Sequence, residues 1–180
     1  RGVDLAVFRP DLGPSPDFEG LARPIQLYVG RVAVEKNIEA FLKTDQPGTK
    51  VIVGDGPAFS DLEARYPEAV FLGKRGGDDL ARCYADADVF VFPSKTDTFG
   101  LVMIEALACG VPVAAFPVMG PKDVITSKKI GCLDEDLHAA IRNALQKNRE
   151  DCRAFAEARS WKASAETFQS YLHEFDPSRT

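Results

Sequence analysis

Residues 25–43 read IQLYVGRVAVEKNIEAFLK, and this stretch decides the fold class. A short apolar run ends at a glycine, a polar loop follows, and the next residues have the spacing of an amphipathic helix. An apolar run of this length without alternation indicates a strand that is buried on both faces. The succession of strand, loop and helix is the unit from which parallel sheets are built.

The same succession recurs along the chain, with short apolar runs separated by helical stretches. Strands that alternate with helices at this spacing predict right-handed crossovers. We therefore expect an α/β fold, with a Rossmann-like parallel sheet and helices on both faces. The expected strands are residues 25–30, 50–54, 69–73, 88–93 and 111–116, and the expected helices between them are residues 36–43, 59–66, 78–87 and 101–109.

The two ends of the chain differ from this regular centre. Residues 1–24 contain many Pro and Gly residues from Pro10 onward, which predicts an irregular lead-in. Beyond Pro121 the sheet signal is reduced to one weak candidate strand at residues 129–133. We expect residues 1–180 to form a single domain, since one core can hold a chain of this length. The helices expected after the weak strand are residues 134–148, 150–158 and 162–175.

Composition and charge narrow the class of protein. Of the 180 residues, 45% are hydrophobic and 27% are charged, and the net charge of −5 argues against a nucleic-acid-binding domain. The four cysteines form no CxxC pair, so neither a zinc site nor a redox pair is indicated, and we expect a cytoplasmic protein. No apolar run approaches the ~18 residues that a membrane span needs. The chain begins at Arg1 without an initiator Met, from which we expect a piece of a longer protein.

Polar loops follow four of the expected strands, and each loop begins at a glycine or a proline. The carboxyl ends of parallel strands meet at one edge of the sheet, and ligands of open α/β sheets bind outside that edge. We therefore expect the chemistry of this protein at that edge. The four loops begin at Gly30, Gly54, Gly73 and Pro93.

The loop at residues 30–37 is the first candidate site. Gly30 lets the backbone approach a ligand, and Arg31 and Lys36 add two cations in front of the amide groups of a helix. Such a loop suits a diphosphate. The alternative is that both cations are solvated and paired with Glu35 and Glu39.

The second candidate site lies at residues 96–113. Asp97 precedes a helix, Gly100 opens its first turn so that amide groups face an anion, and Glu105 lies about one turn inside it. Two carboxylates facing one cleft suit the hydroxyl groups of a sugar. The alternative is an acid that precedes a helix and a solvated glutamate. Glu105 is flanked by apolar residues, however, and a buried glutamate needs a partner.

The two sites, together with four other motifs in order, resemble the C-terminal domain of glycosyltransferase family 4, the large group of retaining enzymes with the GT-B fold. The resemblance runs from residue 1 to about residue 126 and returns weakly at residues 160–171. The matching motifs are Gly2-Val3-Asp4 with Phe8-Arg9-Pro10, Gly30-Arg31 with Glu35-Lys36-Asn37, Val53-Gly54-Asp55-Gly56-Pro57, Phe71-Leu72-Gly73, Tyr84 to Ser94, and Asp97 to Pro112.

The resemblance implies a donor-binding domain for a nucleotide-diphosphate sugar, a UDP- or GDP-sugar. Arg31 and Lys36 would hold the diphosphate, and Glu105 would bind the ribose hydroxyls. The first acid of the family motif is usually Glu, whereas this chain has Asp97, which bears on the identity of the sugar. The amides of Phe99, Gly100 and Leu101 would touch the distal phosphate and the sugar, and the loop Lys74-Arg75-Gly76 would lie against the nucleobase. The remaining implied donor-binding residues are Gly30, Gly54, Gly73 and Thr98.

The resemblance also implies a hexosyltransferase that transfers the sugar with retained configuration once it is joined to an N-terminal acceptor-binding domain. No metal or other cofactor is expected, and the isolated chain is expected to bind nucleotide with little or no turnover. The final helix, within residues 160–180, would cross back onto the N-terminal domain and leave apolar side chains exposed. Peripheral membrane association of the full-length enzyme is compatible with the resemblance.

Other interpretations remain open at this stage. A sugar-nucleotide epimerase or a glycan phosphorylase shares the GT-B fold, although the expected catalytic histidines or cofactor lysine have no counterpart here. A non-catalytic nucleotide sensor or a flavodoxin-like signalling module is the alternative from another class. Asp86 and Asp88 form the DxD pattern of metal-dependent glycosyltransferases, but they precede a strand and are expected at the opposite edge of the sheet.

Overall fold

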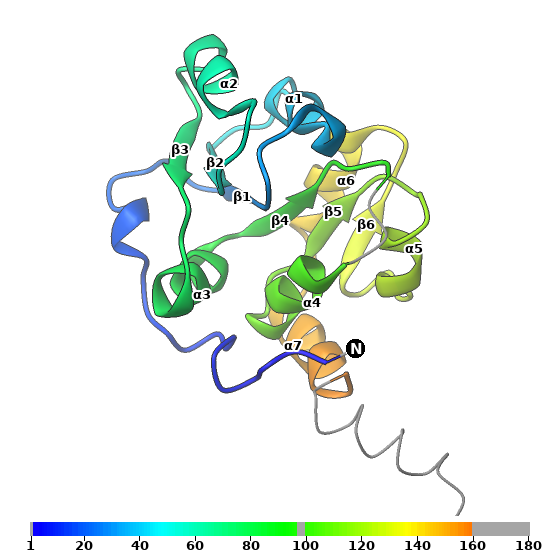
Figure 1. Cartoon of the computed structure of the whole chain (residues 1–180). Helices are drawn as coiled ribbons and strands as arrows, with labels where there is room; N and C mark the ends of the chain where they lie inside the picture. The colour runs from blue at the N-terminus through cyan, green and yellow to red at the C-terminus, as the bar shows by residue number, and fades with distance from the viewer. Residues whose placement is uncertain (1, 97–99, 160–180) are drawn as a thin grey trace, which may run out of the picture.

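A six-stranded parallel sheet lies at the centre of the molecule, with helices on both of its faces (Figure 1). The computed structural model describes residues 2–96 and 100–159. The six strands are β1 (Ile25–Val29), β2 (Thr49–Val53), β3 (Val70–Gly73), β4 (Val89–Phe92), β5 (Val113–Ala115) and β6 (Gly131–Leu133). The five strong strand predictions and the weak sixth one are confirmed.

The strands lie in the order β3-β2-β1-β4-β5-β6, and every neighbouring pair is parallel. This is the strand order of the doubly wound Rossmann fold, in which the direction of winding reverses between β1 and β4. The predicted fold class is therefore confirmed. Because the chain leaves β1 and β4 toward opposite sides, a crevice opens between their carboxyl ends.

Seven α-helices and two 3₁₀ turns are present in the described part of the chain. The helix predicted at residues 36–43 is interrupted at Asn37, whose φ of 55° is left-handed. The helix predicted at residues 134–148 is shorter than expected, α5 was not expected, and the helix predicted at residues 162–175 lies outside the described residues. The elements are η1 (Pro16–Phe18), η2 (Val34–Lys36), α1 (Ile38–Leu42), α2 (Phe59–Arg65), α3 (Gly77–Asp86), α4 (Leu101–Ala108), α5 (Pro121–Val124), α6 (Leu137–Ala144) and α7 (Arg149–Glu157).

Alternate residues of each strand contribute to two separate cores. In β1, Leu27 and Val29 face a core that includes side chains of α3, α4 and α7, whereas Tyr28 faces a core formed with α1, α2 and α6. All five residues of β1, including the polar Gln26, are buried, so burial does not alternate along the strand, as its sequence predicts. The helices on both faces hold the carboxyl edge of the sheet open to ligands.

Two arginines of α7 bind the C-terminal ends of α3 and α4. Arg149 donates hydrogen bonds to the carbonyl oxygens of Ala85, in the last turn of α3, and of Ala87 and Cys109, the residues that end α3 and α4. Arg153 donates to the carbonyl oxygen of Ala108 at the end of α4. Carbonyl groups at the end of a helix lack partners within the helix, and these guanidinium groups supply them.

In the described residues, no helix is both long and apolar enough to span a lipid bilayer.

Candidate functional site

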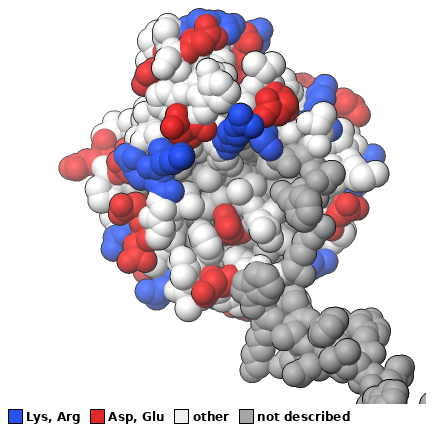
Figure 2. Space-filling view, viewed as in Figure 1, with Lys and Arg blue, Asp and Glu red and all other residues white. Residues whose placement is uncertain are grey.

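A hollow of about 600 Å³ lies at the carboxyl edge of the sheet, where the loops after β1, β2 and β3 meet. The space-filling view shows this side of the molecule hollowed, with a mostly uncharged floor and Lys and Arg side chains along its upper rim (Figure 2). The residues that line the hollow are Val29, Gly30, Arg31, Val53, Gly54, Asp55, Gly56, Pro57, Lys74 and Arg75.

Glycines bring the backbones of the first two loops into direct contact. A Cβ atom on Gly54 would lie 1.8 Å from the carbonyl oxygen of Gly30, and one on Gly56 would lie 2.3 Å from the carbonyl oxygen of Val32. The amide of Val32 donates to the carbonyl of Asp55 at 2.9 Å, and the amide of Gly54 donates to Gly73 at 2.9 Å. Gly54 was predicted as a ligand contact, and its backbone also joins all three loops into one wall.

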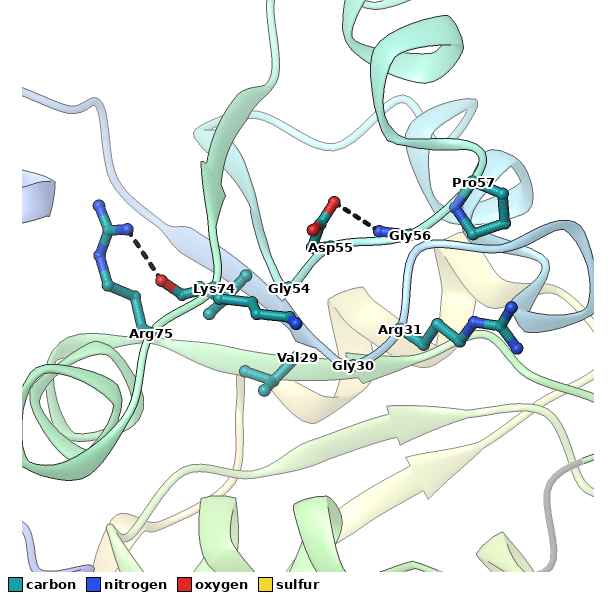
Figure 3. A pocket seen from close by; sticks show the side chains of 10 residues that line it. Val29, Gly30, Arg31, Gly54, Asp55, Gly56, Pro57, Lys74 and Arg75 are labelled. Atoms are coloured by element: carbon teal, nitrogen blue, oxygen red, sulfur yellow. Dashed lines mark hydrogen bonds between the residues drawn. The ribbon is translucent and has the colours of Figure 1, made fainter.

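Three cationic side chains from two loops line this hollow. Lys74 extends across it toward Gly30 and Gly54, while Arg31 and Arg75 point to either side (Figure 3). The Arg31 side chain is 64% exposed and lies 3.4 Å from Glu35 Oε1, a contact that solvent screening makes weak. An anion entering the hollow would therefore meet a positive charge on Arg31 that Glu35 neutralises only weakly.

Arg75 is held more tightly than the other two cations. Its Nε lies 2.8 Å from Asp17 Oδ2 and its Nη2 lies 3.0 Å from Asp17 Oδ1, while Nη1 donates to the carbonyl of Leu72. The hydrogen bonds from Arg75 hold the pKa of the Asp17 carboxyl below its ordinary value. The guanidinium group is thus shared between the rim of the hollow and the lead-in segment.

Lys36, the second predicted diphosphate ligand, lies in η2, is half-buried and does not line the hollow. The next residue, Asn37, donates from its side-chain amide to the carbonyl oxygen of Pro93 at 3.0 Å. This bond connects the loop after β1 to the loop after β4 across the crevice. Glu39, the alternative partner of the two predicted cations, pairs with Lys43 and Arg65 and accepts a hydrogen bond from Tyr66.

Glu105 lies on α4, as predicted, and is half-buried. The hydroxyl of Tyr84, which is completely buried on α3, donates to Glu105 Oε2 at 2.9 Å. Burial raises the pKa of the Glu105 carboxyl, and the hydrogen bond from Tyr84 offsets only part of this rise. A half-buried glutamate with a partner on one oxygen matches the expectation that it is not merely solvated.

Gly100 and Leu101 stand at the start of α4, where the sequence predicts a contact with an anion. Gly100 is buried, and a Cβ atom on it would lie 2.5 Å from Met103 Cε and 2.8 Å from Val124 Cγ2. Leu101 is 41% exposed. Asp97, Thr98 and Phe99, which were also predicted to bind the donor, lie outside the described residues.

The structure thus gathers part of the predicted site in one hollow and leaves part outside it. Gly30, Arg31, Gly54, Lys74 and Arg75 line the hollow, whereas the predicted residues of α4 do not. Gly73 ends β3, and its carbonyl accepts the bond from Gly54.

Three residues that shape the site were not predicted to do so. The hydroxyl of Tyr28 donates to the carbonyl of Arg31 at 2.9 Å, and Asn37 and Asp17 act as described above. Only Tyr28 carries a signal in the sequence, because a tyrosine in the middle of a buried strand needs a partner for its hydroxyl.

The DxD pattern lies at the opposite edge of the sheet, as predicted. Asp88 directly precedes β4, accepts hydrogen bonds from Arg23 and from the amide of Ile25, and so lies beside the amino end of β1. Asp86 also pairs with Arg23. These two carboxylates fasten the lead-in segment to the sheet.

Comparison with known proteins places this chain in a family. Residues 23–151 match the family described as glycosyl transferases group 1. A GDP-mannose-dependent α-mannosyltransferase of Mycobacterium tuberculosis (strain CDC 1551 / Oshkosh) is 41% identical over 142 residues, which make up 74% of this chain and 36% of that protein. The chain therefore spans well under two thirds of this relative.

Solved structures agree on the fold. Sucrose-phosphate synthase from Thermosynechococcus elongatus superposes with a TM-score of 0.77 at 29% identity, over 94% of this chain and 50% of its own. HepE (Alr3699) of Anabaena, solved in complex with UDP and glucose, gives a TM-score of 0.72 at 21% identity, over 96% of this chain and 56% of its own. The second likeness concerns the fold alone. The chain belongs to the group 1 glycosyltransferases, family 4, and its six-stranded Rossmann-like domain matches one half of their GT-B structures.

Proposed function

We propose that this chain is the donor-binding half of a retaining hexosyltransferase, which transfers a sugar from a UDP- or GDP-sugar to an acceptor. The observation that carries the proposal is the hollow over the carboxyl ends of β1, β2 and β3, beside the switch point between β1 and β4, with Arg31 next to the glycine backbones of its wall. Open α/β sheets bind nucleotides at this point. Closely apposed glycine backbones and nearby cations are what a diphosphate requires.

The chemistry follows from where charge develops. As the bond between sugar and diphosphate breaks, negative charge grows on the leaving phosphate and positive charge on the anomeric carbon. Arg31 and Lys36, together with the amide groups at the start of α4, would stabilise the leaving phosphate. Glu105 would accept a hydrogen bond from a donor hydroxyl on the oxygen that Tyr84 leaves unused.

An acceptor would be bound by the part of the full-length enzyme that this chain does not contain, and the isolated chain would transfer little or no sugar. In the described residues, the large apolar side chains that are exposed are Val34, Leu101 and Met119, which follow β1, β4 and β5. Each comes after the carboxyl end of its strand, on the side of the sheet that carries the crevice. The proposed acceptor-binding domain would be joined on this side. The proposed compartment is the cytoplasm, with peripheral attachment of the full-length enzyme to a membrane.

Thermal unfolding with a panel of nucleotides tests the proposal. A ligand that binds only the folded chain adds about 2.7 kcal/mol of stability at a hundredfold excess over Kd. We expect GDP or UDP to raise Tm, and Arg31→Ala and Lys36→Ala to reduce that rise. In the full-length enzyme, Arg31→Ala is expected to lower kcat by about 10²–10³-fold. No shift with any nucleotide in either the chain or the full-length enzyme would refute donor binding.

A further inference from the structure

The loop after β3 is the least constrained wall of the donor hollow. It contains Gly73, Gly76 and Gly77, and a Cβ atom on any of these would meet nothing within 4 Å. No neighbouring atom requires a glycine at these positions, and the glycines make the backbone of the loop more flexible. Lys74, the cation that crosses the hollow, stands in this loop.

A second hollow, of about 410 Å³, lies behind the same loop. Its far wall is the lead-in segment at Ser15, Pro16 and Asp17, so the loop is a thin partition between two cavities. Neighbouring core side chains therefore contribute little to fixing its position. What crosses the second hollow is the ion pair between Asp17 and Arg75, with both oxygens of the carboxylate engaged.

The Asp17 end of this ion pair is firmly placed. Asp17 lies in η1 between Ser15 and Phe18, which are both buried. The amide of Ser15 donates to Asp86 Oδ2 at 2.8 Å on α3, and the amide of Phe18 donates to the carbonyl of Ser15 at 3.0 Å. A carboxylate on such a support holds a guanidinium group in one orientation through two parallel hydrogen bonds.

The Arg75 end sets the conformation of the loop itself. The same guanidinium donates to the carbonyl of Leu72, before the loop, and to the carbonyl of Lys74 at 3.2 Å, within it. One side chain thus joins the lead-in segment, the end of β3 and the residue that faces the donor hollow. Without the carboxylate of Asp17, the Arg75 guanidinium would no longer be held in one orientation, and its bonds to Leu72 and Lys74 would no longer fix the loop.

We propose that Asp17 is a positioning residue for donor recognition: acting through Arg75, it fixes the Lys74–Gly76 loop against the nucleoside part of the donor. This inference rests on the proposed function, since it needs a nucleotide in the first hollow. It takes from the family resemblance that the diphosphate lies at the loop after β1 and the nucleobase at the loop after β3. A ligand that lacks a nucleoside should therefore be indifferent to Asp17.

Calorimetric titration of the 180-residue chain with GDP, UDP and inorganic pyrophosphate tests this assignment. Asp17→Asn keeps the shape of the side chain and removes its charge. If the loop then holds its binding conformation about a tenth of the time, the Kd of the nucleotide rises about tenfold. The Kd of pyrophosphate should stay within about twofold of the wild-type value.

Two matched variants separate positioning from general damage. Asp61→Asn removes another carboxylate paired with an arginine, Arg65 at 3.0 Å on α2, and should leave both affinities unchanged. In an Arg75→Gln background, Asp17→Asn should add no further loss, because Asp17 acts only through Arg75.

The outcomes divide cleanly between the two claims. If neither the wild-type chain nor the full-length enzyme binds a nucleotide, the proposed function is overturned, and this inference with it. A wild-type chain that binds nucleotide, with an Asp17→Asn variant that loses nucleotide and pyrophosphate equally or loses neither, overturns the inference alone. Additive losses in the double variant also overturn it.

Discussion

The loops after β1 and β2 and the loop after β3 are all rich in glycine, yet they hold their conformations in different ways. In the first two, glycines allow backbone to touch backbone, and a single added methyl group at Gly54 would overlap the Gly30 carbonyl. In the third, the glycines stand in open space; beyond Gly73, whose carbonyl accepts a hydrogen bond from Gly54, the ion pair Asp17–Arg75 holds the loop. The first wall is fixed by the main chain, and the second is fixed by two side chains.

This difference suits the two parts of a nucleotide sugar. A diphosphate is common to all such donors, so a rigid backbone wall serves every one of them. A nucleoside differs between donors, and side chains are replaced more easily than a backbone packing arrangement. The comparison leads to three predictions, which run from the largest expected effect to the smallest.

Gly54→Ala should produce the largest change. Its Cβ atom would lie 1.8 Å from a backbone oxygen, and the φ of 137° at this position disfavours any other residue. We expect a loss of at least about 3 kcal/mol in the free energy of unfolding, measured with urea. Gly73→Ala is the control, because its φ of 67° costs only about 1–2 kcal/mol and its Cβ has open space. Equal losses in the two variants would contradict the distinction between the loops.

Asp17→Asn should produce a smaller loss that depends on pH. Replacing the carboxylate of such an ion pair by a neutral amide lowers the free energy of unfolding by about 1 kcal/mol at neutral pH. Since the folded pKa of Asp17 lies below its ordinary value, the stabilisation is present above that value and is lost as pH falls through the folded pKa.

Urea unfolding of the wild type and Asp17→Asn from neutral pH down to about pH 3 measures this dependence. The difference between them should shrink in acid, whereas the loss caused by Gly54→Ala, which is steric, should not. A difference of the same size throughout would show that Asp17 stabilises the loop without its charge.

Gly76→Ser should produce the smallest effect, and with the opposite sign. Gly76 is the N-cap residue of α3, has extended backbone angles and has no atom near its missing Cβ. Serine is a better N-cap than glycine and restricts the unfolded chain, so we expect a gain of about 0.5 kcal/mol. Chemical unfolding measures it, and a loss greater than about 1 kcal/mol would mean that the loop after β3 is as tightly packed as its neighbours.

The strands and the edge that carries the site could be predicted from the sequence, because apolar runs that end in glycine report burial on both faces. The first and last residues of the helices were harder to predict from the sequence. The expected helix at residues 36–43 breaks at Asn37, whose side chain bonds to Pro93, a residue 56 positions away. The expected helix at residues 134–148 begins only after Asp136, whose side chain caps it by accepting the amide of His138.

The contacts within the site were also hard to predict, because they too depend on residues that lie far apart in the sequence. A glycine after a strand marks a loop, but whether it allows a ligand or another backbone to approach depends on what lies opposite. The family resemblance implies a ligand contact for Arg75, whereas its main partner in the structure, Asp17, is 58 residues away. Such pairings arise from the tertiary fold, which no local pattern records.

The hydrogen bond from Asn37 to Pro93 has a mechanical consequence. It acts as a strut between the two halves of the sheet, at the point where the chain reverses its direction of winding. The separation of the two sides of the crevice is then set when the chain folds, before any donor arrives. We expect a donor to enter along the open side without spreading them, so that any closure over it moves this whole domain as a rigid body.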